Sequence, residues 1–505
     1  MKRTISFIIV ITVLFSCFSF GVSAFTEKGN EYPLILVIGR GANTPYYGDD
    51  GEQIFPITVS TEELTEKVKV CLPYLAAGLA SGDFEPWAKK VGEVIKPIYS
   101  DLIPDKNGNL NGGPGVVNGY GYPITKGKSF YDYTFNYDWR KDTSESADTL
   151  NEYICQVKEA EQCDKVSLVG RCYGSNVIAA YLYKYGHSDI DTVVFYCSTA
   201  LGCYASGCIF SGEIKLNPKG MESFLNGAPL SGEPVIDAFL RSTVSFLNAF
   251  NGIEPLSDFA NVLIKKAFPV LAPEIFPISY GAMTCFWNMV DNGRYEKAKK
   301  LIYNGRENEF SDFIEKTDFY HYTIVANLPE MLKQYMKEGL NVGVVAKYGQ
   351  DALYPLYDNG NPQSDDTVEL NLSSFGTSFS EYGKIFSKSY LEAADMRFIS
   401  SDHCVDSSTA AFRDNTWYIK SAPHSTFPVS VDRLIATICN YDGQMTVNDN
   451  ENYSQFMKYD AGTGKISVLT DEPQADSQLK LGIFEKLKNL LSSIINIIKA
   501  IFKIM

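Results

Sequence analysis

The sequence predicts an α/β fold with a mostly parallel sheet and an inserted helical segment. Short apolar runs suited to strands buried on both faces alternate with amphipathic helical patterns between residues 32 and 196. Within this region a strand, a glycine-bounded turn and a helix follow directly on one another from Val166 to Tyr185. From about 198 to 339 the pattern changes to long apolar helical stretches without clear strands, which is typical of a helical cap inserted over the edge of a sheet.

Length and charge limit the classes of protein to which this chain can belong. Its 505 residues, 45% of them hydrophobic, are enough to bury a large core, as in one big catalytic domain with insertions. The net charge is −15 and the body of the chain has no basic run, so we expect no nucleic acid partner.

The first 24 residues have the pattern of a secretory signal peptide. Met1-Lys2-Arg3 supplies the charged start, an apolar run extends to about Val22, and Val22-Ser23-Ala24 is a small-x-small cleavage site. Lipid attachment at Cys17 is the lesser alternative, because bulky Phe15 and the apolar residues after Cys17 do not suit it. In either case we expect a protein that is secreted or associated with the cell surface.

The first strand is expected within Tyr32–Gly39, a continuously apolar run. It leads into a glycine-bearing loop, Arg40-Gly41-Ala42-Asn43-Thr44. The elements expected next, in order, are helical structure over 60–100, a surface loop over 105–121, a strand over 130–135 and a helix over 142–160.

Residues 166–179 carry the motif around which the chain is organised. A buried strand at Val166–Val169 runs into Gly170-Arg171-Cys172-Tyr173-Gly174, and a helical pattern follows. This is the G-x-Nuc-x-G pattern of a nucleophile elbow, with cysteine in the nucleophile's position. Glycine on either side lets strand and helix approach closely around a strained residue, and a helix N-terminus makes a thiol more acidic. Cys172 is therefore the expected nucleophile, the alternative being a buried structural cysteine.

Two backbone amides are expected to face an oxyanion formed at Cys172. The first belongs to Tyr173, which directly follows the nucleophile. The second comes from the loop after the first strand, from Arg40 or Gly41, although an ordinary turn explains that loop equally well.

The remaining elements complete the expected domain organisation. Strands are expected at 190–196, 341–348 and 416–420, a helix at 431–439, and a hairpin around Gly462-Thr463-Gly464. We expect an α/β domain over residues 25–440 with its cap at about 198–339, followed by a hairpin and polar linker over 441–480.

Two apolar segments each admit two interpretations. The aromatic residues of the cap are either ordinary core, which is the commoner case, or the lining of an acyl-chain pocket (Phe239, Phe246, Phe250, Phe286 and Trp287). Residues 481–505 predict an amphipathic helix with lysines and a very apolar face. Its polar interruptions argue against a membrane span, and docking on the domain and contact with a membrane surface are equally open.

Ten cysteines follow the expected signal peptide. Without Cys172 nine remain, an odd number spread through a large domain rather than a dense disulfide framework. Cys203 and Cys208 can pair, but the connectivity cannot be read from the sequence. No clustered Cys/His spacing predicts zinc, so no metal and no cofactor are expected.

A cysteine nucleophile needs a base, and the base needs an orienting acid. His424 follows the last expected core strand, which is where this architecture places its base. Two aspartates, each in an Asp-x-x-Val turn, compete as the acid. We favour Asp402, because the interval to His424 leaves room for one short helix and one strand, with Asp365 as the alternative. The other histidines are His187, His321 and His403.

With these residues in place, the chain resembles the lecithin–cholesterol acyltransferase and lysosomal phospholipase family of α/β hydrolases, and more distantly bacterial lipases. The resemblance covers roughly residues 30–440 and rests on Pro33–Gly39, on Tyr137-Asp-Trp-Arg140, on the elbow and on the Tyr348-Gly349 loop leading to Asp365-Asp-Thr-Val368. The chain departs from the family in having Cys172 where the family has serine, and in a divergent cap.

The resemblance implies an α/β-hydrolase fold and a lipase, esterase or O-acyltransferase-like activity on lipid or other acyl esters. In the mechanism that follows, the aspartate fixes the imidazole tautomer, His424 activates Cys172, and the thiolate attacks the ester carbonyl. A tetrahedral intermediate expels a thiolate ahead of an alkoxide, so ester turnover is expected to be slow. The alternative is a catalytically inactive hydrolase fold that serves as a surface binding protein.

Overall fold

The computed structural model describes residues 32–40, 45–57, 60–105, 108–114, 130–215, 253–350, 362–471 and 473. Several expectations fall outside these residues: the signal peptide over 1–24, Gly41, the cap aromatics Phe239, Phe246 and Phe250, and the amphipathic helix over 481–505. Within the described ranges, no helix is both long enough and apolar enough to span a bilayer.

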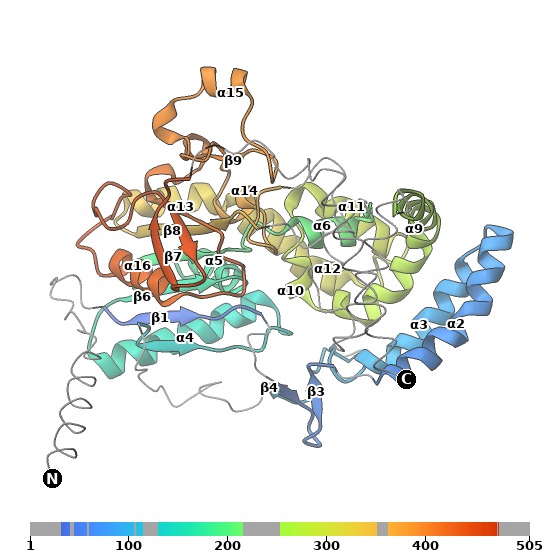
Figure 1. Ribbon diagram of the computed structural model, residues 1–505. Coiled ribbons are helices and arrows are strands. Elements are labelled where there is room, and N and C mark those ends of the chain that lie inside the picture. The colour runs from blue at the N-terminus through green and yellow to red at the C-terminus, as the bar shows by residue number, and fades with distance from the viewer. Residues whose placement is uncertain are drawn as a thin grey trace, which may run out of the picture.

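The core of the fold is an eight-stranded sheet with the order β13-β12-β11-β8-β7-β6-β1-β5 (Figure 1). Every neighbouring pair is parallel except the last hairpin, in which β13 runs against β12. Parallel neighbours must be joined by crossover connections, which are usually helical, and helices separate most of these strands in the chain. The expected α/β fold is therefore confirmed. The strands are β1 (Leu34–Val37), β5 (Tyr133–Phe135), β6 (Val166–Arg171), β7 (Ile190–Tyr196), β8 (Asn341–Tyr348), β11 (Thr416–Lys420), β12 (Phe456–Asp460) and β13 (Lys465–Val468).

Side chains of the central strands alternate between two hydrophobic layers, one on each face of the sheet. In β7, Val193 and Phe195 belong to the larger layer, whereas Val194 and Tyr196 belong to the second. Both faces are therefore buried, which explains why these strands read as continuous apolar runs. The larger layer contains residues of α4 (Thr143–Glu161), α5 (Gly174–Tyr185) and α13 (Leu328–Lys337), and the second contains residues of α16 (Val429–Cys439).

The C-terminal hairpin is part of the main sheet. β12 pairs in parallel with β11, where Ile419 lies opposite Met457, and Met457 is fully buried. The domain boundary expected at residue 440 is therefore wrong. The physical reason is that β12 covers the backbone edge of β11, which would otherwise present unpaired hydrogen-bonding groups to solvent.

The segment between β7 and β8 is helical in its described part, as expected, but the cap ends earlier than residue 339. Leu328 and Leu332 of α13 are fully buried in the larger hydrophobic layer, so α13 covers the sheet rather than the cap. A crossover to a parallel strand needs such a helix to pack back on the sheet. The preceding helices are α6 (Tyr204–Ser211), α9 (Ile253–Ile275), α10 (Thr284–Trp287), α11 (Asn292–Tyr303) and α12 (Ser311–Asp318).

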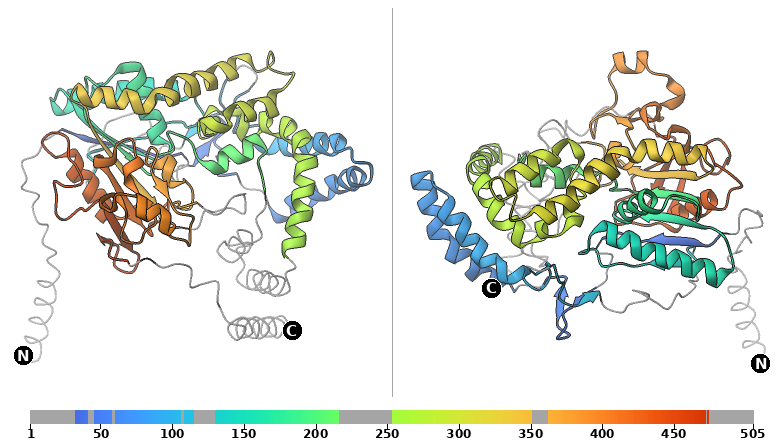
Figure 2. Two further views of the ribbon diagram at one scale, coloured as in Figure 1. Left: turned by 90° about the horizontal axis from the view of Figure 1, so that it is seen from above. Right: turned by 180° about the vertical axis from the view of Figure 1, so that it is seen from behind.

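The helical structure expected over 60–100 consists of two helices, α2 (Thr61–Ser81) and α3 (Glu85–Tyr99). Gly82 ends α2 with a φ of +81°, a left-handed conformation that glycine adopts without strain. Both helices lie at the end of the molecule farthest from the sheet, where α3 packs along α9 (Figures 1 and 2).

The Tyr137-Asp138-Trp139-Arg140 block forms a buried polar cluster beside the first strand. The Arg140 guanidinium pairs with the Asp138 carboxylate at 2.7 Å, and both side chains are almost completely buried. Arg140 also donates to the backbone carbonyls at positions 111 and 112, at 2.9 Å each. The Tyr137 hydroxyl donates to the Ile38 carbonyl at 3.0 Å. These hydrogen bonds of Tyr137 and Arg140 fix the loop after β5 against the end of β1.

Candidate active site

Cys172 lies at the carboxyl end of β6, where the chain turns into α5. Its φ is +53°, in the left-handed region that residues other than glycine rarely adopt. Backbone bonds on both sides hold this conformation: Cys172 N–H donates to the Tyr196 carbonyl at 3.0 Å, and Ser175 N–H donates to the Cys172 carbonyl at 3.0 Å. The turn places a half-buried thiol at the edge of the sheet.

The glycines of the elbow are required by close backbone packing. A Cβ atom on Gly174 would lie 2.1 Å from the Val37 carbonyl oxygen, and one on Gly170 would lie 2.7 Å from the Ser175 Cα atom. Both obstacles are main-chain atoms, which cannot rotate away. The expected strand–turn–helix around Cys172 is therefore present, and its glycines have the predicted steric role.

His424 lies in the loop after β11, and two contacts with Asp365 fix its orientation. The ring Nδ1 is 2.7 Å from Asp365 Oδ2, and the backbone N–H of His424 donates to the Asp365 carbonyl at 2.6 Å. The charge of the ring also acts on the Cys172 thiol and lowers its pKa. The base predicted from the sequence thus lies between the predicted nucleophile and a carboxylate.

Asp365 is a fully buried carboxylate whose second oxygen is held by the backbone. The N–H groups of Val368 and Thr367 donate to Oδ1 at 2.7 Å and 3.1 Å. Val368 is itself fully buried in the larger hydrophobic layer. The Asp-x-x-Val turn therefore works as expected, with the valine anchoring the loop and one carboxylate oxygen left for His424.

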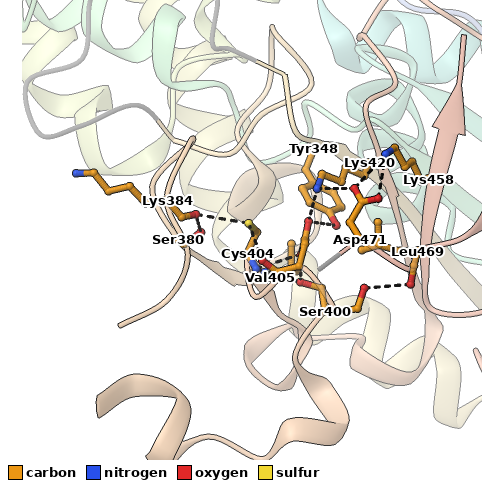
Figure 3. A network of polar contacts seen from close by, with 12 residues as sticks. Tyr348, Ser380, Lys384, Ser400, Cys404, Val405, Lys420, Lys458, Leu469 and Asp471 are labelled. Carbon is orange, nitrogen blue, oxygen red and sulfur yellow. Dashed lines mark hydrogen bonds and ion pairs between the residues drawn. The ribbon is translucent and has the colours of Figure 1, made fainter. Parts of the chain in front are cut away.

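Asp402, which the sequence favoured as the acid, lies in a different polar network. Its Oδ2 pairs with Lys420 Nζ at 2.8 Å and accepts a hydrogen bond from the Tyr348 hydroxyl at 3.2 Å. Figure 3 shows Lys420 in this network between Tyr348 and Asp471, to which it also pairs, at 2.9 Å. The preference for Asp402 is therefore wrong, and the carboxylate on His424 is that of Asp365.

The sheet order explains this correction. β8 pairs with both β7 and β11, so the loop after β8, which holds Asp365, meets the loop after β11, which holds His424. Asp402 belongs to the segment between β8 and β11. There β9 (Ser378–Phe379) and β10 (Val405–Asp406) form a separate two-stranded sheet. Position relative to the sheet, rather than the interval along the chain, decides which carboxylate reaches the base.

The charges of Cys172 and His424 are coupled. Burial by itself raises the pKa of the Cys172 thiol, but the charge and hydrogen bond of His424, assisted by Arg40 and the Tyr173 N–H, lower that pKa below its ordinary value. Burial by itself lowers the pKa of His424, but Asp365 and Cys172 raise that pKa well above its ordinary value. The two directions agree and favour a thiolate–imidazolium pair.

The predicted oxyanion residues lie beside the thiol where they are described. Tyr173 is the residue before α5, and its backbone N–H contributes to lowering the pKa of the Cys172 thiol. The Tyr173 ring is buried, with its hydroxyl 2.6 Å from Thr143 Oγ1. Arg40 follows the first strand, and its side chain lies close enough to act on the Cys172 thiol. The sequence predicted a role only for the Arg40 amide, so the position of its guanidinium is new.

The comparisons with known proteins leave the family open. No protein-family model matches the chain, and no curated protein matches it. A solved structure described as "The crystal structure of Tle4-Tli4 complex" is 12% identical, and the match covers 64% of this chain and 76% of that chain with a TM-score of 0.25. A likeness this weak carries no argument. The α/β fold stands on the strand order itself.

Two residues next to His424 were missed by the sequence analysis. Lys347, on β8, is fully buried, and its Nζ donates to the carbonyls of the loop that holds the base: Pro423 at 3.0 Å, His424 at 3.1 Å and Thr426 at 2.7 Å. Cys197 directly follows β7, is fully buried and has a φ of +40°. The sequence held a signal for each residue. Lys347 is a lysine inside an apolar strand, and Cys197 comes one residue after the strand that neighbours the elbow strand.

Cys197 completes a group of possible metal ligands. Its sulfur and ligand atoms of Asp365 and His424 lie within 4.8 Å of one another. However, His424 Nδ1 and Asp365 Oδ2 are 2.7 Å apart, which is a hydrogen-bond distance. Zinc bonds of about 2.0–2.2 Å at a tetrahedral angle would hold the two atoms further apart. The arrangement fits proton transfer, and we assign no metal to it.

The remaining candidates lie away from Cys172. His187 pairs with Glu338 at 3.0 Å, and His321 is buried in the cap, where its Nε2 lies 3.0 Å from the Trp287 carbonyl. All ten cysteines of the described chain, Cys203 and Cys208 among them, carry free thiols. Trp287 is fully buried in the core of the cap, as in the commoner of the two interpretations of its aromatics.

Proposed function

We propose that this protein is an acyl-ester hydrolase or acyltransferase with a Cys172–His424–Asp365 triad. The proposal is carried by one observation: His424, hydrogen-bonded to Asp365 at 2.7 Å, faces a cysteine at a strained elbow. The three residues follow the order nucleophile, acid, histidine, which is the order in α/β hydrolases.

The proposed reaction begins with the thiolate of Cys172 attacking the ester carbonyl carbon. The backbone N–H of Tyr173, together with an amide of the Arg40–Gly41 loop, stabilises the oxyanion. His424 then gives its Nε2 proton to the departing alkoxide, and a thioester remains on Cys172. Water or a second alcohol, deprotonated by His424, attacks this thioester and releases the acyl group with the thiolate restored.

Protonation by His424 decides whether this reaction proceeds. An unassisted tetrahedral adduct would expel the thiolate and return to the substrate, because a thiolate is a better leaving group than an alkoxide. The raised pKa of His424 keeps a proton available for the alkoxide oxygen, and Asp365 keeps the ring aligned while that proton moves. The buried Asp365–His424 pair is therefore the part of the site on which ester turnover depends.

The proposed substrate is a lipid-like or other acyl ester, by resemblance to the acyltransferase and phospholipase family. We further propose that residues 1–24 direct the protein out of the cytoplasm, to a secreted or cell-surface location. In the same proposal, residues 481–505 contact a membrane surface through their apolar face.

Thiol labelling combined with ester turnover tests the proposal. Iodoacetamide at pH 6.5, followed by mass spectrometry, should label Cys172 ahead of the exposed Cys155, and His424→Ala should abolish this selectivity. A panel of p-nitrophenyl esters of graded chain length should be hydrolysed by the wild type and by Cys155→Ala, but not by Cys172→Ala. Absence of turnover in the wild type, with no rescue by Cys172→Ser, would contradict the proposal and favour an inactive surface binding protein.

A further inference from the structure

Arg40 brings a cation to the candidate active site, where no carboxylate of the described residues forms an ion pair with it. Its guanidinium carbon lies 4.4 Å from the centre of the Phe286 ring and 5.7 Å from that of Trp139. Its Nε is buried and has no hydrogen-bond partner. In the part of the chain that the structure describes, Arg40 contacts aromatic rings and forms no ion pair.

The acids of this region are already engaged. Asp138 is held by Arg140 at 2.7 Å, and Asp365 is held by His424 at the same distance. The positive charge of Arg40 therefore acts on the uncharged or weakly acidic groups around it. It lowers the pKa of the Cys172 thiol, and it opposes the burial that raises the pKa of the Cys285 thiol. The backbone places Arg40 there, because a Cβ atom on the preceding Gly39 would lie 3.0 Å from Cys172 Cβ.

An unpaired donor at this position needs an explanation. A buried N–H without an acceptor costs roughly 1–3 kcal/mol, and most buried polar groups in folded proteins are paired. The indole N–H of Trp139, whose ring lies beside Arg40, is a second buried donor without a partner. Contact with the Phe286 and Trp139 rings holds the guanidinium in place and leaves its Nε–H without an acceptor.

A planar guanidinium whose Nε–H lacks a partner matches a carboxylate or a phosphate, which a guanidinium can bind through two parallel hydrogen bonds. We propose that Arg40 binds an anionic oxygen group of the substrate, a carboxylate or a phosphate, next to the carbonyl that Cys172 attacks. The inference rests on the proposed function and restricts its substrate class to anionic esters. Neutral esters of the same length should be the poorer substrates.

Two alkylating reagents of nearly equal size test this inference without ester turnover. Iodoacetate and iodoacetamide both lose iodide to a thiolate, but only iodoacetate carries a carboxylate. The ratio of their rate constants at Cys172, iodoacetate over iodoacetamide, is independent of the thiolate fraction. Cys155, which is exposed, supplies the reference ratio within the same protein. We expect the ratio at Cys172 to exceed that at Cys155 by about tenfold, as for one charge-assisted contact.

Variants of Arg40 separate anion binding from simple acidification of the thiol. Arg40→Gln should bring the ratio at Cys172 down to the Cys155 reference, and Arg40→Lys should keep most of it because the charge remains. If Arg40→Gln slows both reagents equally, Arg40 only acidifies Cys172 and the inference is overturned. If Cys172 reacts slowly with both reagents in the wild type, the proposed function fails and the inference fails with it.

A competition arm identifies the chemical source of the anion. Succinate and inorganic phosphate are each added to the iodoacetate reaction at constant ionic strength, with chloride as the control. Protection of Cys172 by succinate assigns a carboxylate, and protection by phosphate assigns a phosphate. Protection by neither, at concentrations where chloride is also without effect, overturns the inference. A p-nitrophenyl hemisuccinate should then be cleaved faster than p-nitrophenyl pentanoate, with the preference lost in Arg40→Gln.

Discussion

His424 Nδ1 and Asp365 Oδ2 lie 2.7 Å apart although 59 positions separate the two residues in the chain. The two loops are tied a second time through their backbones, because His424 N–H donates to the Asp365 carbonyl at 2.6 Å. A ring fixed at both points can turn only one nitrogen toward the thiol of Cys172. The predictions below follow from this arrangement and from the packing that supports it.

Asp365→Asn and Asp402→Asn form a matched pair of substitutions. Asp365→Asn removes the charge that raises the pKa of His424 and favours the wrong tautomer, so Cys172 labelling at pH 6.5 should slow by about 100-fold or more. Asp402→Asn weakens the pair with Lys420 and should lower thermal stability while the labelling rate changes less than about threefold. Iodoacetamide kinetics and thermal unfolding measure the two effects. If Asp402→Asn slowed the labelling of Cys172 more than Asp365→Asn does, the assignment of Asp365 would be contradicted.

The reactivity of Cys172 should depend on pH in a way that His424 controls. A thiolate reacts and a thiol does not, so the labelling rate falls as the pH drops through the thiol pKa. Because the pKa of Cys172 is lowered, the rate should stay high at pH values where an ordinary thiol, with a pKa near 9.0, is already protonated. In His424→Ala, burial becomes the main influence on the pKa of Cys172 and raises it. The pH profile of the labelling rate should therefore move to higher pH. Superimposable profiles for wild type and variant would contradict the thiolate–imidazolium pair.

Gly174→Ala should destabilise the elbow strongly. Its Cβ would lie 2.1 Å from the Val37 carbonyl oxygen, so β1 and α5 must separate, at a cost of about 2–4 kcal/mol. Gly92→Ala in α3 is the control, because its Cβ would make an ordinary contact of 3.5 Å, and alanine there should be neutral or stabilising by up to about 1 kcal/mol. Urea unfolding midpoints compare the two, and equal midpoints would refute the steric argument.

Lys347→Met should loosen the loop that carries His424. The substitution leaves three carbonyls without their donor, and we expect a loss of about 2–4 kcal/mol in unfolding free energy together with slower labelling of Cys172. Lys458→Met removes a partly exposed lysine from its pair with Asp471 and should cost less than about 1 kcal/mol, with labelling unchanged. Equal losses in the two variants would show that Lys347 has no special role.

Much of the sheet could be predicted because its strands have strong local signals. Ile190–Tyr196, Asn341–Tyr348 and Thr416–Lys420 were expected at the positions where the structure has them, since each is a run that is buried on both faces and bounded by polar or glycine residues. The boundary at residue 440 was wrong for a related reason. A hairpin pattern shows that two strands pair with each other, but it does not show that one of them also joins a larger sheet.

The sequence by itself indicated the candidate nucleophile and the candidate base. Cys172 lies in a spacing that only a strained strand–helix turn requires, and His424 lies in the loop just after a strand, so both signals are contained in a few neighbouring residues. Only the tertiary structure decided that Asp365 rather than Asp402 meets His424, and that the Arg40 guanidinium lies against the Phe286 and Trp139 rings. Those relationships depend on which strands are neighbours in the sheet, and neighbouring strands are chosen by packing among segments that lie far apart in the chain.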